Sequence, residues 1–127
     1  MPGSRVPRVI DHVGLEVRDY RRSKDFYAAA LAPLGFELAI EFEGRVGGFA
    51  RDGKPWFWIR EGEPAAGVHV AFRAPDGDAV DAFHVAAVAA GGEDNGLPGL
   101  RAHYHPTYYA AFVRDPDGNN VEAVHHG

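Results

Sequence analysis

A repeat at a spacing of 57 residues constrains this chain more than any other feature. The pair His12-Val13 returns 57 residues later as His69-Val70, and Asp19, Phe26 and Gly35 return as Asp76, Phe83 and Gly92. Residues 49–52 return, with one substitution, as residues 112–115 at a spacing of 63, so the second copy holds six extra residues, which fit the segment 95–105. Two copies of one unit predict a pseudo-twofold molecule whose ligand site draws equivalent positions from both halves.

The first copy has the pattern of a βαβββ module. Apolar and polar residues alternate over residues 8–17, which is typical of a strand. Asp19 is placed to cap a helix over residues 20–31, and Pro33 and Gly35 end it. Three more strands are expected at residues 36–42, 46–51 and 55–60, with an Asp-Gly turn between the last two. Module one therefore spans about residues 8–61.

The second copy predicts the same order over about residues 67–126. A strand is expected at residues 68–73, a helix at 77–90, a poorly patterned strand near 93–101, and a final strand pair at 108–114 and 119–125. The fold class is therefore α+β: two βαβββ modules form a single domain, residues 1–127, with a mixed sheet that curls around a cleft. Each helix is expected to cover one sheet face, which leaves the other face for the cleft.

Composition narrows the functional classes. A chain of 127 residues that is 46% hydrophobic is large enough to bury a core. A net charge of −5 without a basic run argues against a nucleic-acid partner. The absence of cysteine excludes disulfides, thiolate metal sites and a cysteine nucleophile. No segment has the apolar length of a membrane span, and residues 1–8 have no apolar core of signal-peptide length, so a cytoplasmic protein without a membrane partner is expected.

Both repeated histidines lie on the strand face opposite the aliphatic residues, so His12 and His69 are expected to face the cleft. Aligning the last strands on their turn glycines, at a spacing of 65, sets Glu122 at the position of Phe57 and on the cleft face. The same parity assigns Trp56 and Trp58 to the helix-facing side. Two imidazoles and one carboxylate from three strands form a ligand set for a divalent metal and leave coordination positions open for substrate.

Three segments carry a resemblance to a known family: Ile-Asp-His-Val at residues 10–13, Gly-Val-His-Val at 67–70 and Arg-Asp-Pro-Asp-Gly-Asn-Asn-Val-Glu at 114–122. With the paired modules, they resemble the vicinal oxygen chelate superfamily, which includes glyoxalase I, fosfomycin- and bleomycin-resistance proteins and extradiol dioxygenases. The resemblance implies a divalent metal, with iron, nickel, zinc, cobalt and manganese all open, held by His12, His69 and Glu122. It also implies a homodimer, because the family commonly pairs modules across chains.

One departure from the family pattern bears on the activity. Glyoxalase I generally supplies a fourth ligand from the last strand of module one, where Phe57 aligns and cannot bind metal. The favoured interpretation is a glyoxalase-like, metal-dependent lyase or isomerase acting on a small oxygen-chelating substrate. The alternatives are a small extradiol-type dioxygenase, although those enzymes are usually longer, and a binding protein that sequesters a drug.

Acid and base candidates gather in residues 103–109. Besides Glu122, the sequence favours His105 and Tyr109 as catalytic groups, because imidazole titrates near neutral pH and a phenol can donate to a developing oxyanion. The alternative is that this segment is a loop whose aromatic side chains pack over the sheet. The surrounding loop, residues 95–107, holds the six extra residues and is expected to cover the mouth of the cleft.

Overall fold

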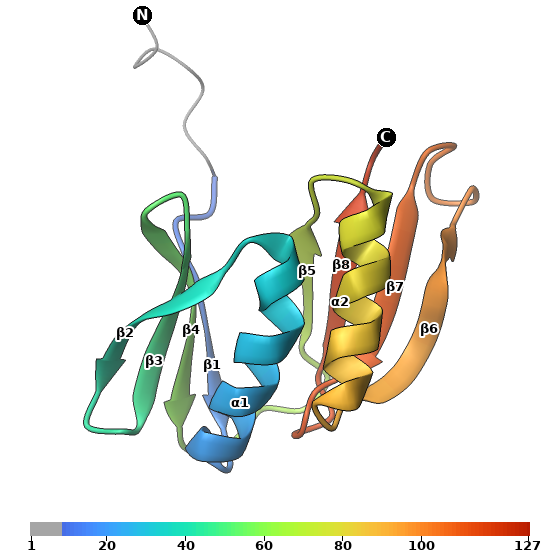
Figure 1. Cartoon of the computed structure of the whole chain (residues 1–127). Helices are drawn as coiled ribbons and strands as arrows, with labels where there is room; N and C mark the ends of the chain where they lie inside the picture. The colour runs from blue at the N-terminus through green and yellow to red at the C-terminus, as the bar shows by residue number, and fades with distance from the viewer. Residues whose placement is uncertain (1–8) are drawn as a thin grey trace, which may run out of the picture.

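The computed structural model describes residues 9–127 and confirms the βαβββ order in both modules (Figure 1). Module one consists of β1 Val13–Val17, α1 Tyr20–Leu31, the short 3₁₀ helix η2 Ala32–Leu34, β2 Glu37–Phe42, β3 Val46–Arg51 and β4 Lys54–Glu61. Module two consists of β5 His69–Arg73, α2 Gly77–Ala89, β6 Glu93–Leu100, β7 Tyr109–Arg114 and β8 Asn120–His125. The poorly patterned segment near residue 93 is thus a strand. The expectations for residues 1–8, including the start of the domain, lie outside the described residues.

Each module builds its own mixed sheet of four strands, and the predicted α+β fold is confirmed. The strand orders are β1-β4-β3-β2 and β5-β8-β7-β6. In each sheet the first and last strands of the module pair in parallel, whereas the other pairs are antiparallel. The described strands form two open sheets and not one closed sheet.

The first strand is shorter than the alternating pattern predicts. Pairing with β4 begins at Val13, opposite Phe57. The two preceding residues interact through their side chains and not through strand pairing. Asp11 contacts the imidazole of His12 and the ammonium group of Lys54. The alternation over residues 8–12 therefore does not correspond to a strand in the part that the structure describes.

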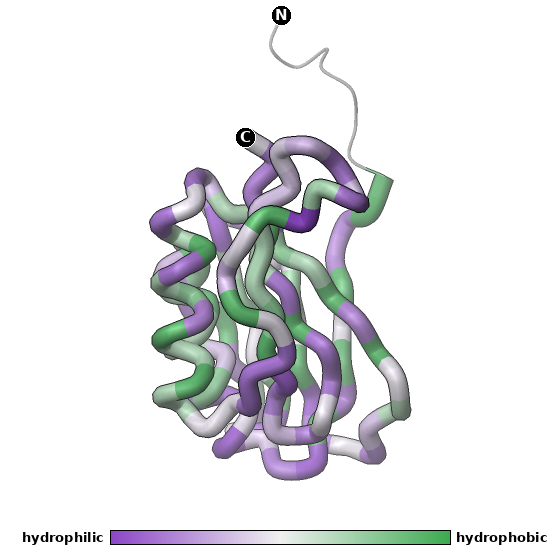
Figure 2. The backbone as a smooth tube through the Cα atoms, turned by 90° about the vertical axis from the view of Figure 1, so that its right-hand side faces the viewer, coloured by the Kyte–Doolittle hydropathy of each residue, from purple (hydrophilic) through white to green (hydrophobic). Residues whose placement is uncertain are grey.

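Both helices lie on the same side of the sheets (Figures 1 and 2). Buried apolar side chains of the helices and the strands form one core between them. The two helices also pack against each other. Asp19 caps α1 by accepting from the Arg22 amide at 3.2 Å, and Asp76 caps α2 by accepting from the Ala79 amide at 2.8 Å, which confirms the repeated Asp as a helix start. None of the helices in residues 9–127 is long and apolar enough to cross a membrane.

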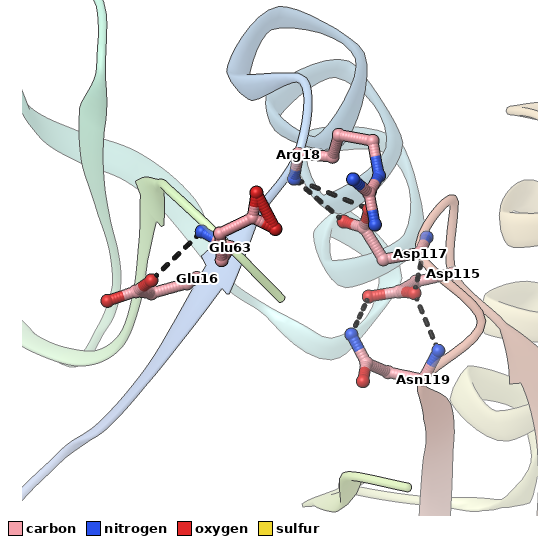
Figure 3. Close-up of polar contacts among 6 residues, drawn as sticks. All are labelled: Glu16, Arg18, Glu63, Asp115, Asp117 and Asn119. Carbon is pink, nitrogen blue, oxygen red and sulfur yellow. Dashed lines mark hydrogen bonds and ion pairs between the residues drawn. The ribbon is translucent and has the colours of Figure 1, made fainter. Parts of the chain in front are cut away.

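The turn after β7 fastens the second module to the first. The buried carboxylate of Asp115 accepts from the backbone and side-chain amides of Asn119, at 2.8 and 2.9 Å, and from the hydroxyl of Tyr27 on α1, at 2.5 Å. Asp117 accepts the backbone N–H of Arg18, which follows β1 (Figure 3). Burial, together with the neighbouring Asp115, raises the pKa of Tyr27 well above its usual value. The most specific segment of the family resemblance is therefore an intermodule contact as well as a turn.

Candidate metal centre

The sheet face of module two that points away from the helices carries an imidazole and a carboxylate in contact. Glu122 lies in β8 opposite Ala71 of β5. Because side chains alternate along a strand, Glu122 points away from Val121 and Ala123, which belong to the core. The Nε2 atom of His69 lies 2.8 Å from the Oε1 atom of Glu122. The structure thus brings together two of the three predicted metal ligands.

Glu122 is deeply buried although it is acidic. The residue is 1% exposed, whereas the side chain of His69 is 51% exposed. The second carboxylate oxygen of Glu122, Oε2, accepts a hydrogen bond from the hydroxyl of Tyr108 at 2.5 Å. Burial, helped by this hydrogen bond, raises the pKa of Tyr108 to about 12, so the phenol stays protonated and acts as a donor at neutral pH. A carboxylate removed from water is costly unless it is paired, which makes a cation a favourable partner for Glu122.

His12 lies just before β1, on the corresponding face of module one. Its side chain is 57% exposed, and its Nδ1 atom lies 2.8 Å from Asp11 Oδ1. The same carboxylate oxygen lies 3.0 Å from Lys54 Nζ. The hydrogen bond with His12, and then the contact with Lys54, lowers the pKa of Asp11. An imidazole held through Nδ1 keeps Nε2 available for a metal.

Within one chain, His12 does not join the other two predicted ligands. Among residues 9–127, no three His, Asp or Glu side chains gather closely enough to hold a metal ion. A hollow lined by both modules does connect His12 with Ala71, the residue that pairs with Glu122, but it does not bring the side chain of His12 to the pair formed by His69 and Glu122. His69 and Glu122 fit a divalent ion as part of a ligand set, and that set needs at least one further ligand.

The prediction that Phe57 occupies the position of Glu122 is wrong by one residue. Val13 pairs with Phe57 while its repeat partner Val70 pairs with Val121, so the residue equivalent to Glu122 is Trp58. An irregularity in the pairing of β3 with β4, between Phe49 and Ala50, shifts the register relative to the turn glycines. Phe57 is 1% exposed in the core. Trp58 consequently lies on the open face, not on the helix-facing side.

Tyr109 lies on the helix side of the sheet, away from Glu122. Its hydroxyl donates to Asp81 of α2 at 2.6 Å, and this hydrogen bond raises the pKa of Tyr109. The preceding residue, Tyr108, contacts Glu122 instead, because a shift of one residue moves a side chain to the other face. Tyr108 could have been found from the sequence, because it lies four residues before Phe112 and so on the same face of the strand. Phe112 pairs directly with Glu122.

His105 lies in the exposed loop between β6 and β7, apart from the pair formed by His69 and Glu122. Its Nδ1 atom accepts from the Thr107 amide at 3.2 Å. Its ring centroid lies 6.2 Å from that of His126, which in turn lies 5.2 Å from the ring of Tyr108. The backbone carbonyl of His105 also accepts the N–H of Tyr108 at 3.0 Å, so the loop is tied to the residue that contacts Glu122, whereas the imidazole of His105 has two rings between it and Glu122.

Comparisons with known proteins agree with this architecture. The family model described as the glyoxalase/bleomycin resistance protein/dioxygenase superfamily matches residues 9–123. A solved glyoxalase/bleomycin resistance protein from Albidiferax ferrireducens is 33% identical, and the match covers 93% of this chain and 99% of that chain with a TM-score of 0.82. A comparison with curated proteins finds no match.

More distant structures share the fold. A lactoylglutathione lyase from Agrobacterium tumefaciens is 20% identical, with 94% of this chain and 95% of that chain covered and a TM-score of 0.68. The fosfomycin resistance protein FosX from Listeria monocytogenes, in complex with Mn(II) and dihydroxypropylphosphonic acid, is 20% identical, with 94% and 90% covered and a TM-score of 0.69. The resemblance seen in three segments of the sequence is confirmed: this chain belongs to the glyoxalase/bleomycin resistance protein/dioxygenase superfamily.

Proposed function

We propose that this protein is a metal-dependent lyase or isomerase of the glyoxalase type, acting on a small substrate that presents adjacent oxygens. The observation that carries the proposal is the pair formed by His69 and Glu122, in which a carboxylate only 1% exposed meets a half-exposed imidazole at 2.8 Å. Imidazole and carboxylate are common ligands of catalytic divalent metals. The manganese in the distant structural neighbour FosX is consistent with a divalent ion in this fold.

The third ligand in this proposal is His12 from a second copy of the chain. Each chain carries two ligands on the open face of module two and one on the open face of module one. A twofold dimer that sets module one of each copy against module two of the other completes two identical sites. Apolar side chains on the open face of module one support such a contact, since Ile40 is 38% exposed and Phe42 is 54% exposed.

A bound divalent ion would act as a Lewis acid toward the substrate oxygens. The residues of the chain have separate tasks around it. His12, His69 and Glu122 hold the ion, and Tyr108 holds Oε2 of Glu122, which keeps Oε1 on the side of His69. His105 is the proposed group for proton transfer, because Thr107 contacts its Nδ1 atom through the backbone amide and the hydroxyl, and these contacts do not involve Nε2. Tyr109 takes no part, since it donates to Asp81 on the other face.

Metal content and metal titration of the purified protein test this proposal. The wild type is expected to bind one divalent ion per chain, whereas His69→Ala and Glu122→Gln are expected to lose it. The matched control is His84→Gln, which removes an imidazole from a second contact with a carboxylate, His84 to Asp94 at 2.8 Å, between α2 and β6. The control should keep its metal, and unchanged metal content in Glu122→Gln would contradict the site.

The identity of the metal separates the enzyme classes. Nickel, zinc, cobalt or manganese without oxygen uptake on catechols supports the lyase or isomerase. Iron together with oxygen uptake would instead support the extradiol-type dioxygenase. Both enzyme proposals would be overturned if the purified protein contained no metal and also bound none in the titration.

A further inference from the structure

The open face of module one contains a hollow beside His12 whose floor is a glycine. Gly14 pairs with Trp58 across β1 and β4, and the hollow above it measures ≈ 330 Å³. Glu16 and Arg60 line its far end, where Arg60 Nη2 lies 2.9 Å from Glu16 Oε2. The hollow therefore extends from His12, a proposed metal ligand, over the backbone of Gly14 to the ion pair between Glu16 and Arg60.

The indole of Trp58 is turned away from Gly14 and forms a wall of this hollow. A Cβ atom on Gly48 of β3 would come within 2.9 Å of the Trp58 ring, so the ring lies over Gly48. The ring of Phe42 on β2 is nearly parallel to the indole, at 9° with centroids 6.4 Å apart. In contrast, a Cβ atom on Gly14 would meet only the Cβ and backbone oxygen of Trp58, at 3.9 and 4.0 Å. The space over Gly14 is open because the ring leans toward β3 and β2.

The charges that line the hollow are already paired. Arg60 contacts one carboxylate oxygen of Glu16. The other oxygen of Glu16 accepts the backbone N–H of Glu63 at 3.1 Å (Figure 3). A charged group placed over Gly14 would lose hydration without gaining a free partner from this ion pair. An uncharged, flat group would instead contact the indole and the backbone of Gly14 without disturbing it.

We propose that the substrate of this site carries an aromatic ring that lies over Gly14 against Trp58, with its adjacent oxygens at the end marked by His12. This substrate class rests on the proposed function, which sets the metal at that end. The volume of the hollow suits one substituted ring. Trp58 is then a residue that determines specificity, because it recognises the part of the substrate that does not react.

The test compares two ligands that differ only in the ring. Mandelate and lactate are both 2-hydroxy acids, and mandelate has a phenyl group where lactate has a methyl group. Calorimetric titration of the Mn²⁺-loaded wild type should give an affinity for mandelate at least about tenfold higher than for lactate. Equal affinities would overturn the proposed substrate class.

The variant Gly14→Val fills the hollow from its floor. The Cβ position has ordinary contacts, and valine is well suited to a strand, so the variant is expected to fold. Its affinity for mandelate should fall about tenfold, to the level of lactate, while its affinities for lactate and Mn²⁺ stay unchanged. Trp58→Leu should likewise abolish the preference for mandelate. The control Trp56→Leu, which removes the other indole of β4, should keep the preference.

The remaining outcomes separate this inference from the proposed function. If the protein binds no metal, the proposed function fails. The aromatic substrate class is then tested with the metal-free protein, in which mandelate must still bind better to the wild type than to Gly14→Val. If metal and both acids bind but Gly14→Val has no effect, the function stands and the substrate class is wrong. A change of oligomeric state in Gly14→Val would show that a second copy fills the hollow, and would also overturn the substrate class.

Discussion

Trp58 occupies in β4 the position that Glu122 occupies in β8. Gly14 pairs with Trp58, and Ala71, which lies 57 residues after Gly14, pairs with Glu122. The two modules therefore share one backbone plan but present different chemistry at matched positions. Module two offers a buried carboxylate in contact with an imidazole, whereas module one offers an indole and an imidazole that line the same hollow.

The register predicts which residue of module one can become a metal ligand. Trp58→Glu should set a carboxylate near His12 and tighten metal binding about tenfold, because it restores a ligand at the position matched to Glu122. Phe57→Glu should give no gain and should lower the free energy of unfolding by more than about 3 kcal/mol, because it buries a charge in the core. Metal titration and urea denaturation measure the two effects. Tighter binding in Phe57→Glu alone would show that this register is incorrect.

Tyr108 is expected to position Glu122 for metal binding. Tyr108→Phe removes the only hydroxyl that donates to Oε2 among the described residues, and should weaken metal affinity roughly 10- to 100-fold. Tyr109→Phe is the matched control, because it removes the neighbouring hydroxyl, which bonds to Asp81 on the helix side. Equal metal affinities in the two variants would rule out this role for Tyr108.

The contact between Tyr27 and Asp115 is expected to stabilise the junction of the modules. Tyr27→Phe leaves the buried Asp115 carboxylate with one donor fewer, and should lower the free energy of unfolding in urea by about 1–3 kcal/mol. Tyr20→Phe serves as the control, because its hydroxyl bonds to the exposed carboxylate of Glu41, and should cost less than about 1 kcal/mol. A larger loss in the control would contradict the assignment.

The raised pKa of Asp117 predicts that its ionisation lowers the stability of the folded protein as the pH rises. Burial, reinforced by the neighbouring Asp115, raises the pKa of Asp117 in the folded state. The folded protein then binds this proton more tightly than the unfolded chain, so ionisation of Asp117 destabilises the fold above its raised pKa. Asp117→Asn keeps an oxygen for the Arg18 amide and should raise the Tm at neutral pH. The gain should shrink as the pH falls through the raised pKa of Asp117, and a gain that grows on acidification would contradict the sign.

Local signals were sufficient to predict the elements of the fold. The helix over residues 20–31 was predicted from its Asp19 cap and the Pro33 and Gly35 stop, and the structure has the same bounds. The strand β6 was harder, because Gly96 and Pro98 interrupt its alternation and its pairing with β7 is irregular. Strands of this kind are stabilised by their partner more than by their own pattern.

The site was less predictable, because it depends on register and on tertiary placement. An alignment of the last strands on their turn glycines does not include the irregularity between Phe49 and Ala50. It therefore matches Glu122 with Phe57, whereas the strand register matches Glu122 with Trp58. The repeat indicated that His12 and His69 are equivalent, but equivalence does not state whether two modules of one chain face each other. The placement of the modules depends on the packing of α1 on α2, which involves apolar surfaces distant in sequence, and it leaves His12 apart from the other two predicted ligands.

The central claim, that one site combines His69 and Glu122 of one copy with His12 of another, is tested most directly by mixing two variants. His12→Ala and His69→Ala, each metal-free alone, are unfolded together and refolded at equal amounts. Random pairing restores one intact site in each mixed dimer, so the mixture should bind about one quarter of the metal bound by the same amount of wild type. No metal binding after mixing, or full binding by His12→Ala alone, would contradict the account.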